Sequence, residues 1–320
     1  MTVTITLSVE VELGWGGHDT GAFGKLSSGG TTERQYLTAL LRECERLSIP
    51  LSFDIVGHLF LAACSGTHDG PHPAGWFDAD PGTDYRTDPL FYAPDVVAYI
   101  RAHEVSHELC THSFSHALFS DAGRDVCAWE LRRAQELHST HAGGPADSLV
   151  PPRHQSPEYD LLHAHDVDCL RPAMPSEQAS DLRRYKQLLA GPLPLSTLRS
   201  RDGVVETYCT TYPSLTAPSL PAGQRATHPA FRPLPERVRR RLHLRKLRQA
   251  TLRAVRQAGH LHLWCHLADL SNESQWQTVR EYLRWLARER ERENISIVPM
   301  AELPAQLRNH RRSQCGLADP

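Results

Sequence analysis

Alternating strand and helix signals in the first 56 residues restrict the fold more than any other feature of this sequence. Residues 2–11 form a β-branched, alternating run, which predicts a buried strand. Residues 31–47 carry apolar side chains at helical spacing, and Thr31 or Thr32 can cap that helix. Residues 49–56 predict a second strand. This order indicates a parallel sheet or barrel, because parallel strands need a long crossover connection, usually a helix.

The same alternation continues toward the C-terminus. We expect helices at 95–101, 129–138, 156–165, 236–258 and 273–291 and from 301 onward, and strands at 107–110, 147–150, 168–172, 204–208, 259–266 and 295–298. The rest of residues 173–227, rich in Pro, Ser and Leu, gives no clear pattern. Polar residues at strand ends fit a (β/α) barrel, in which several strand ends build the site. Periodicity alone leaves an open doubly wound sheet as an alternative.

A pair of histidines, His112 and His116, follows the predicted strand 107–110. On a helix or a tight helical turn, positions four apart share one face, so both imidazoles can converge on one ion. The first strand ends in two acids, Glu10 and Glu12. Two histidines and one carboxylate with an open position are the layout of a catalytic zinc or iron site. The alternative is a solvated or hydrogen-bonded histidine pair.

Four segments resemble the motifs of the polysaccharide deacetylases (NodB-homology, carbohydrate esterase family 4). The segment His112-Ser113-Phe114-Ser115-His116 is similar to that family's metal-binding histidine motif. The other segments, in the family's order, are Ser8–Glu12, Ser148–Arg153 and His262–His266. The resemblance therefore spans most of the chain.

The resemblance implies an irregular, incomplete (β/α) barrel with seven strands. We expect one polysaccharide-deacetylase-like domain over residues 1–312, with an insertion at about 65–94, and a loose tail at 313–320. The insertion is long, with Gly, Pro, Asp and aromatic residues, and we interpret it as a lid or substrate rim. The alternative is a packed surface excursion.

The resemblance also implies a function, the metal-dependent removal of an N-acetyl group from a sugar or glycan precursor. The implied ligands of a divalent ion, Zn²⁺ by preference, are Glu12, His112 and His116. Glu10 would be the general base and His266 the general acid. Arg153 would orient Glu10 or bind a substrate oxygen. Trp264 would line the acetyl pocket and Trp15 would stack on the sugar, although either tryptophan could instead belong to the core.

The sequence departs from the family pattern in three places. Both acids of the first motif are Glu where the family usually has Asp, and Val11 separates them. Glu10 and Glu12 still point to one side of a strand, and their roles could be exchanged. Arg153 follows two prolines, whereas the family order is Arg before Pro, and His154 stands where relatives often carry Asn. Two alternatives stay open: an allantoinase-like hydrolase of cyclic amides or imides, and a non-catalytic sugar-binding descendant.

Composition bears on the partners, the cellular location and the state of the cysteines that we expect. The chain has 320 residues, a net charge of −2 and 40% hydrophobic residues, so we expect no nucleic-acid partner. The start lacks a signal-peptide pattern and the sequence has no long apolar run, which predicts a cytoplasmic protein without a membrane span. Eight scattered cysteines without a Cys-x-x-Cys pair indicate free thiols.

The predicted helix 236–258 is strongly basic. It is either a solvated helix packed on the barrel or a contact to an anionic group, such as the phosphate of a lipid-linked sugar substrate.

Overall fold

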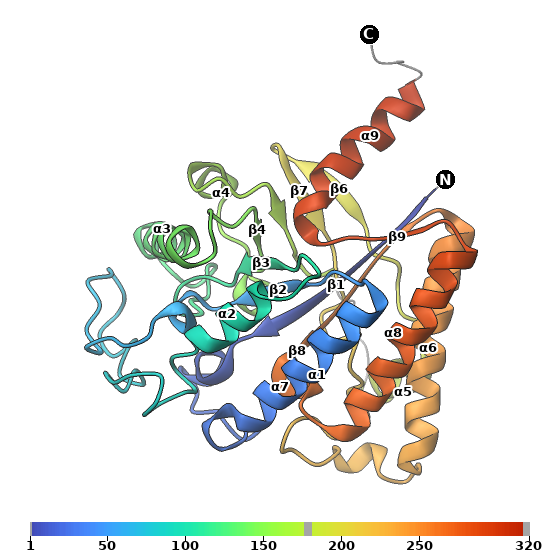
Figure 1. Ribbon diagram of the computed structural model, residues 1–320, viewed down its shortest axis with the longest axis horizontal. Helices are drawn as coiled ribbons and strands as arrows, with labels where there is room; N and C mark the ends of the chain where they lie inside the picture. Colours follow the sequence, from blue (N-terminus) through green and yellow to red (C-terminus); the bar gives the residue numbers. More distant parts are fainter. Residues whose placement is uncertain (1, 176–180, 316–320) are drawn as a thin grey trace.

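A parallel sheet organises the chain in the computed structural model, which describes residues 2–175 and 181–315 (Figure 1). The strands are β1 (Val3–Val11), β2 (Ser52–Ile55), β3 (Glu108–Thr111), β4 (Ser148–Leu149), β5 (Cys169–Leu170), β6 (Leu198–Arg201), β7 (Val204–Thr207), β8 (His260–His266) and β9 (Ile295–Ile297). The helices are α1 (Thr31–Leu47), α2 (Pro94–Arg101), α3 (Arg124–His141), α4 (Tyr159–Ala164), α5 (Asp181–Ala190), α6 (Glu236–Gln257), α7 (Leu267–Leu270), α8 (Glu273–Arg292) and α9 (Leu303–Cys315).

Seven strands form a parallel series in the order β7-β5-β4-β3-β2-β1-β8. In addition, β6 pairs antiparallel with β7, and β9 pairs with residues 3–5 of β1. The sheet nearly closes on itself between β7 and β8. There the Ser196 amide donates to the His260 carbonyl at 3.0 Å, and the Thr207 hydroxyl lies 2.9 Å from His262 Nδ1. The expected irregular seven-stranded barrel is therefore confirmed, and the open sheet is excluded.

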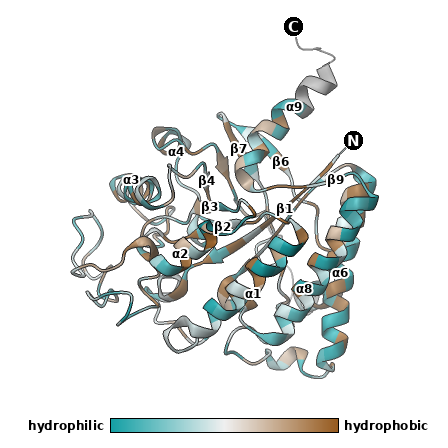
Figure 2. Cartoon of the chain, in the orientation of Figure 1, coloured by the Kyte–Doolittle hydropathy of each residue, from teal (hydrophilic) through white to brown (hydrophobic). Residues whose placement is uncertain are grey.

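The barrel core is built around β1, which is buried along nearly all its length. Its inward and outward side chains are both covered, as expected for a parallel strand with helices outside the sheet. Helices α1, α6 and α8 lie side by side over one part of the sheet (Figure 1). Figure 2 shows hydrophobic residues along the strands and a mostly hydrophilic α6.

Most of the predicted elements are present, with shifted ends. Helix α1 has the predicted bounds, whereas α3 begins five residues before the predicted start at 129. In the stretch that the sequence left without a pattern, the structure places α5 and β6. Helix α9 continues to Cys315, residues 316–320 lie outside the described residues, and the expected loose tail at 313–320 stays a prediction.

The basic helix α6 packs on the barrel. Lys246 is buried and donates to the carbonyls of Gln187 and Leu188, at 3.1 and 3.0 Å, near the C-terminal end of α5, where a cation is favourable. Arg239 is buried as well and donates to the Ser219 carbonyl. Part of the positive charge of α6 therefore lies in buried side chains that bond to backbone carbonyls of neighbouring segments.

Two further sequence-based expectations concern the chain as a whole. Within the described residues, no helix is long and apolar enough to cross a membrane. Seven of the eight cysteines, all those up to Cys265, are free thiols.

Candidate active site and metal centre

Polar side chains gather where the carboxyl ends of the barrel strands meet, as they do in enzymes built on parallel barrels. They come from six strands or from the loops directly after them. These residues are Glu10 and Glu12 (β1), Asp54 (β2), His112 and His116 (β3), Arg153 (β4), Arg171 (β5) and His266 (β8). Apart from Asp54 and Arg171, all were predicted site residues.

His112 and His116 converge, although not on a helix. Both lie in the loop after β3, where Ser113 and His116 adopt left-handed backbone conformations with φ of 60° and 63°. The expectation of a helical face is therefore wrong. Two left-handed turns of the backbone replace it, and the ring centroids lie 5.0 Å apart.

Glu12 lies between the two imidazoles. Its Oε1 is 3.3 Å from His112 Nε2 and 3.2 Å from His116 Nε2. Donor atoms in a tetrahedral zinc site with bonds of about 2.0–2.2 Å lie about 3.3 Å apart. The three predicted ligands therefore have the spacing that a bound divalent ion requires.

Hydrogen bonding at the back of His112 supports the same interpretation. Its Nδ1 donates to the Val150 carbonyl at 2.6 Å, which leaves the lone pair of Nε2 facing the Glu12 carboxylate. Two acceptors that face each other need a cation between them, which is either a proton on Nε2 or a metal ion. Burial lowers the pKa of His112, but the bond to Glu12 and the charge of Glu10 outweigh it and raise that pKa overall. The surroundings thus stabilise positive charge, and the residues fit a divalent metal ion.

Gly16 makes room for the Glu12 carboxylate. Glu12 follows β1 and precedes the short 3-10 helix Leu13–Gly17. A Cβ atom on Gly16 would lie 2.2 Å from Glu12 Oε2 and 2.9 Å from Glu12 Cβ. No larger residue fits at position 16 while Glu12 keeps this position.

Glu10 occupies a different environment from Glu12. Its carboxylate forms an ion pair with the buried Arg171 and lies 3.0 Å from His266 Nε2. Burial raises the pKa of Glu10, but Arg171 and then His266 outweigh it and hold the pKa well below its usual value. Glu10 is therefore ionised at neutral pH and belongs to the His266 side of the site.

Arg171 was not predicted, and it takes the place expected for Arg153. Its guanidinium also donates to Ser8 Oγ at 2.6 Å, lies 3.2 Å from Asp54 Oδ2 and covers the Trp264 ring at 4.7 Å. Burial raises the pKa of Asp54 to about 7, even beside Arg171. A signal existed, because Arg171-Pro172 at the end of β5 has the Arg-before-Pro order that the segment before Arg153 lacks.

Arg153 does not contact Glu10. It is exposed, has a left-handed backbone with φ of 48°, and pairs with Asp19 through distances of 2.7 and 2.9 Å. The expectation that Arg153 orients Glu10 is therefore corrected. Arg153 does line the cavity of the site, so a contact to a substrate oxygen remains a prediction.

His266 is held from behind by a carboxylate that the sequence did not indicate. Its Nδ1 lies 3.2 Å from Asp269 Oδ2, and Asp269 pairs with Lys25 at 2.7 Å. This contact directs Nε2 toward Glu10. Burial lowers the pKa of His266, but Glu10 and Glu12 outweigh it and raise that pKa well above its usual value. The surroundings of His266 therefore favour its protonated form at neutral pH.

The two tryptophans that were predicted to bind substrate lie in different surroundings. Trp264 borders the cavity, and its ring meets His266 edge-on at a centroid distance of 5.2 Å. Trp15 is fully buried and donates through Nε1 to the Phe91 carbonyl. The expectation that Trp15 stacks on a sugar is wrong, because its ring is part of the core.

Glu130, a buried residue of α3, fixes the loop that carries the histidine pair. Its Oε2 accepts the backbone N–H groups of Phe114 and Ser115, both at 2.8 Å, and its Oε1 accepts His72 Nε2 at 2.8 Å. No feature of the sequence indicated this role, because an acid within a helix usually faces solvent.

The site opens into a cavity of about 500 Å³. Its walls include Glu10, Glu12, His116, Arg153, Trp264 and His266. A volume of this size holds a sugar-sized molecule.

Comparisons with known proteins bear on the fold. No protein-family model matches the sequence, and no curated protein matches it significantly. A predicted polysaccharide deacetylase from Mycobacterium smegmatis superposes with a TM-score of 0.61 at 16% identity, over 100% of this chain and 94% of the other. A predicted polysaccharide deacetylase from Pseudomonas aeruginosa PAO1 and the Puue allantoinase each give 0.58 at 9% identity, over 98% of this chain and 92% of theirs.

At this level of identity the likeness concerns the fold. The parallel series of seven strands and the near-closure of the sheet agree with it. The chain therefore has the fold of the NodB-type polysaccharide deacetylases.

Proposed function

We propose that this protein is a metal-dependent hydrolase that removes an N-acetyl group from a sugar or glycan precursor. One observation carries the proposal. Glu12, His112 and His116 converge with metal-ligand spacing beside a separate acid–base pair, Glu10 and His266. A metal site and an acid–base pair at one cavity are the parts that amide hydrolysis requires.

The geometry favours one assignment of the two acids. The Glu12 carboxylate contacts the histidine pair His112 and His116. The Glu10 carboxylate instead contacts Arg171 and His266. Glu12 is therefore the proposed ligand and Glu10 the proposed base. A divalent ion held by Glu12, His112 and His116, with Zn²⁺ preferred, would polarise the acetyl carbonyl and lower the pKa of water at the site toward ~7.

Glu10 takes the proton of the attacking water, since Arg171 keeps its carboxylate ionised. His266 then donates a proton to the departing sugar amine from Nε2, while Asp269 holds Nδ1. Positioned acid–base groups of this kind contribute about 10²- to 10⁴-fold in rate. Trp264 lines the space beside His266 and would contact the acetyl methyl group. Arg153, at the rim, would bind a substrate oxygen.

The substrate class is the second part of the proposal. The cavity suits a carbohydrate with an N-acetyl group. The main alternative is a cyclic amide or ureide, because the Puue allantoinase shares the fold. A lipid phosphate on the sugar would meet cationic side chains, and the exposed arginines of α6 are Arg237, Arg241, Arg245 and Arg256.

Metal content and product release test the proposal together. The wild type and His112→Ala are purified, loaded with Zn²⁺ and measured for bound metal. They are then assayed for acetate release from N-acetylhexosamines and for hydrolysis of allantoin. We expect His112→Ala to lose one ion per chain and all acetate release.

Two outcomes would change the conclusion. Ureide hydrolysis without acetate release would move the function to the allantoinase-like alternative. Equal metal content in the two proteins, with neither activity in the wild type, would leave the non-catalytic sugar-binding alternative.

A further inference from the structure

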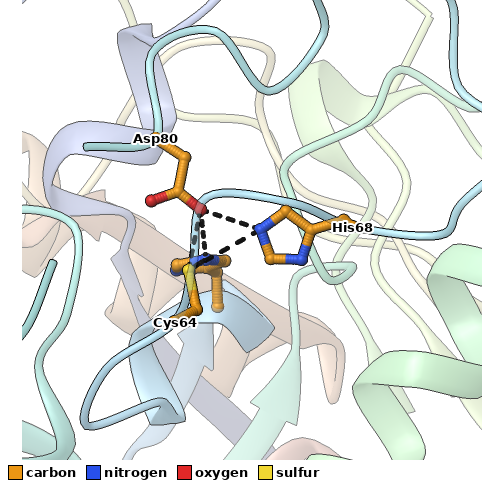
Figure 3. Close-up of side chains that lie close together, drawn as sticks. Cys64, His68 and Asp80 are labelled. Atoms are coloured by element: carbon orange, nitrogen blue, oxygen red, sulfur yellow. Dashed lines mark hydrogen bonds and ion pairs between the residues drawn. The ribbon is translucent and has the colours of Figure 1, made fainter. Parts of the chain in front are cut away.

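A second group of potential metal ligands lies outside the proposed active site. It contains His58, from the 3-10 helix Gly57–Phe60 after β2, together with Cys64, His68 and Asp80. Figure 3 shows Cys64, His68 and Asp80 pointing at one another. His68 and Asp80 belong to the insertion 65–94, whereas His58 belongs to the barrel, so the group joins the two.

The four ligand atoms surround one point. Asp80 Oδ2 lies 3.0 Å from His58 Nε2, 2.7 Å from His68 Nε2 and 3.1 Å from Cys64 Sγ. Cys64 Sγ lies 3.6 and 3.9 Å from the same two nitrogen atoms. Ligand atoms of a tetrahedral zinc site lie about 3.3–3.7 Å apart, given bonds of about 2.0–2.3 Å. The two sulfur–nitrogen distances are close to this range, and the three distances to Asp80 Oδ2 are somewhat shorter.

Hydrogen bonds from neutral histidines do not explain this arrangement. Asp80 Oδ2 has two lone pairs but faces three groups. The other oxygen, Oδ1, already accepts the Tyr92 hydroxyl and the Gly82 N–H. His58 Nδ1 lies 3.1 Å from the Phe91 carbonyl and donates to it, so a neutral His58 directs the Nε2 lone pair at the carboxylate. A cation at the centre removes both conflicts.

The geometry also argues against a nucleophilic cysteine. In a Cys–His–Asp relay, one imidazole nitrogen faces the sulfur and the other faces the carboxylate. Here the same atom, Nε2, faces both groups in His58 and again in His68. The four side chains are therefore arranged as ligands around a centre.

We propose that His58, Cys64, His68 and Asp80 bind a Zn²⁺ ion in a closed, four-coordinate structural site. Thiolate and imidazole ligands favour zinc among the common divalent ions. The groups behind the ligands fit this role. The Phe91 carbonyl orients His58, the Gly66 N–H points at the Cys64 sulfur from 3.3 Å, and Tyr92 holds the second oxygen of Asp80.

The site supports the loop that carries His112 and His116. The backbone N–H of His58 donates to the Phe114 carbonyl at 2.8 Å, and the rings of His58 and His68 each lie 5.4 Å from the Phe114 ring. From the insertion, Trp76 Nε1 donates to Ser115 Oγ at 2.8 Å. The ion would therefore attach the insertion to the back of this loop, whether or not the protein is a deacetylase.

Zinc content of the full chain separates the two sites. Wild type, Cys64→Ser, His112→Ala and the double variant are loaded with Zn²⁺ and dialysed. We expect about two ions per chain in the wild type, one in each single variant and none in the double variant. Cys127→Ser removes a buried thiol of α3 that does not belong to the group, and it should keep both ions. If Cys64→Ser binds as much zinc as the wild type, the proposal is overturned.

Substitution with Co²⁺ gives a second test that does not need a folded Cys64 variant. The proposed active-site ligands include no sulfur, so a thiolate-to-cobalt charge-transfer band reports Cys64. We expect the band in the wild type and at full intensity in His112→Ala, where only the second site remains. Its absence from both proteins at saturating Co²⁺ would overturn the proposal. The same zinc content in His112→Ala as in the wild type, together with retention of the band, would indicate failure of the active-site proposal alone.

Discussion

Glu10 and His266 lie directly opposite each other in the β1–β8 ladder, and Glu10 Oε2 is 3.0 Å from His266 Nε2. Because opposite residues of a parallel ladder point to the same face of the sheet, the register itself brings the proposed base and acid together. Arg171 on one side and Asp269 on the other hold the two partners in place.

Glu10→Gln tests the role of the carboxylate while it keeps the shape of the side chain. We expect a decrease in kcat of about 10²- to 10⁴-fold, because the amide cannot take a proton. Bound zinc should stay unchanged, since Glu12 and the two histidines are intact. Glu10→Asp is the matched control, because it keeps the charge and should retain part of the activity. Wild-type kcat in Glu10→Gln would rule out Glu10 as the base.

The two arginines of the site should behave differently when each is changed to Met. Arg171→Met removes the guanidinium that pairs with the buried carboxylates of Glu10 and Asp54, so we expect a loss of about 3–5 kcal/mol in unfolding free energy and a large decrease in kcat. Arg153→Met removes an exposed side chain and should mainly raise KM. Urea unfolding and steady-state kinetics of both variants measure these effects. A larger decrease in kcat for Arg153→Met would restore the role first predicted for it.

Glu130→Gln should loosen the histidine loop. The amide offers one acceptor oxygen where the carboxylate offers two, and the carboxylate accepts the N–H groups of Phe114 and Ser115 as well as His72. We expect zinc affinity to fall about 10- to 100-fold, as for other groups that orient metal ligands. Competition with a chelator of known affinity measures the change.

The control for that experiment lies on the same helix. Glu136 is exposed and pairs with Arg132 and Arg133. Glu136→Gln removes the same charge from α3 without touching the loop, so zinc affinity should not change. Equal losses in both variants would mean that the net charge of α3, and not the loop contacts, sets the affinity.

The site residues that could be predicted lie at the ends of strands, and the residues next to them in the chain already indicate those strands. Glu10, Glu12 and His266 stand at the ends of long buried strands, and the histidine pair follows a third strand. The seven-stranded barrel was predicted from the resemblance to the polysaccharide deacetylases, because periodicity alone left an open doubly wound sheet as an alternative. The segment with β6 and α5 was not predicted, because a four-residue strand and a ten-residue helix are short signals within a stretch rich in Pro and Ser.

Site residues whose contacts are distant in the chain were not predicted. Arg171 reaches Glu10 across 161 positions and Asp54 across 117. Such contacts depend on strand register and on loop paths, which periodicity does not specify. The histidine pair shows the same limit. Its spacing suggested a helix, whereas the structure brings the rings together through left-handed residues held by Glu130.

A buried histidine on α3 should make the fold sensitive to acid. His138 is 1% exposed and packs on Phe60, and its ring nitrogens have no hydrogen-bond partner among the described residues. Burial lowers its pKa to about 3, whereas an unfolded histidine has a pKa of about 6.5. Between these values the unfolded chain binds more protons, so the free energy of unfolding falls as the pH falls from about 6.5 toward 3.

His138→Leu removes this dependence, and His141→Leu, an exposed position one turn further along α3, is the matched control. By pH 5 the His138 contribution amounts to about 2 kcal/mol. Urea unfolding at pH 7 and pH 5 should therefore show a loss about 2 kcal/mol smaller in His138→Leu than in the wild type or in His141→Leu. Other buried or metal-binding histidines affect all three proteins equally and cancel in this difference. An equal loss in all three would mean that His138 is already protonated in the fold, with a partner that stabilises its charge.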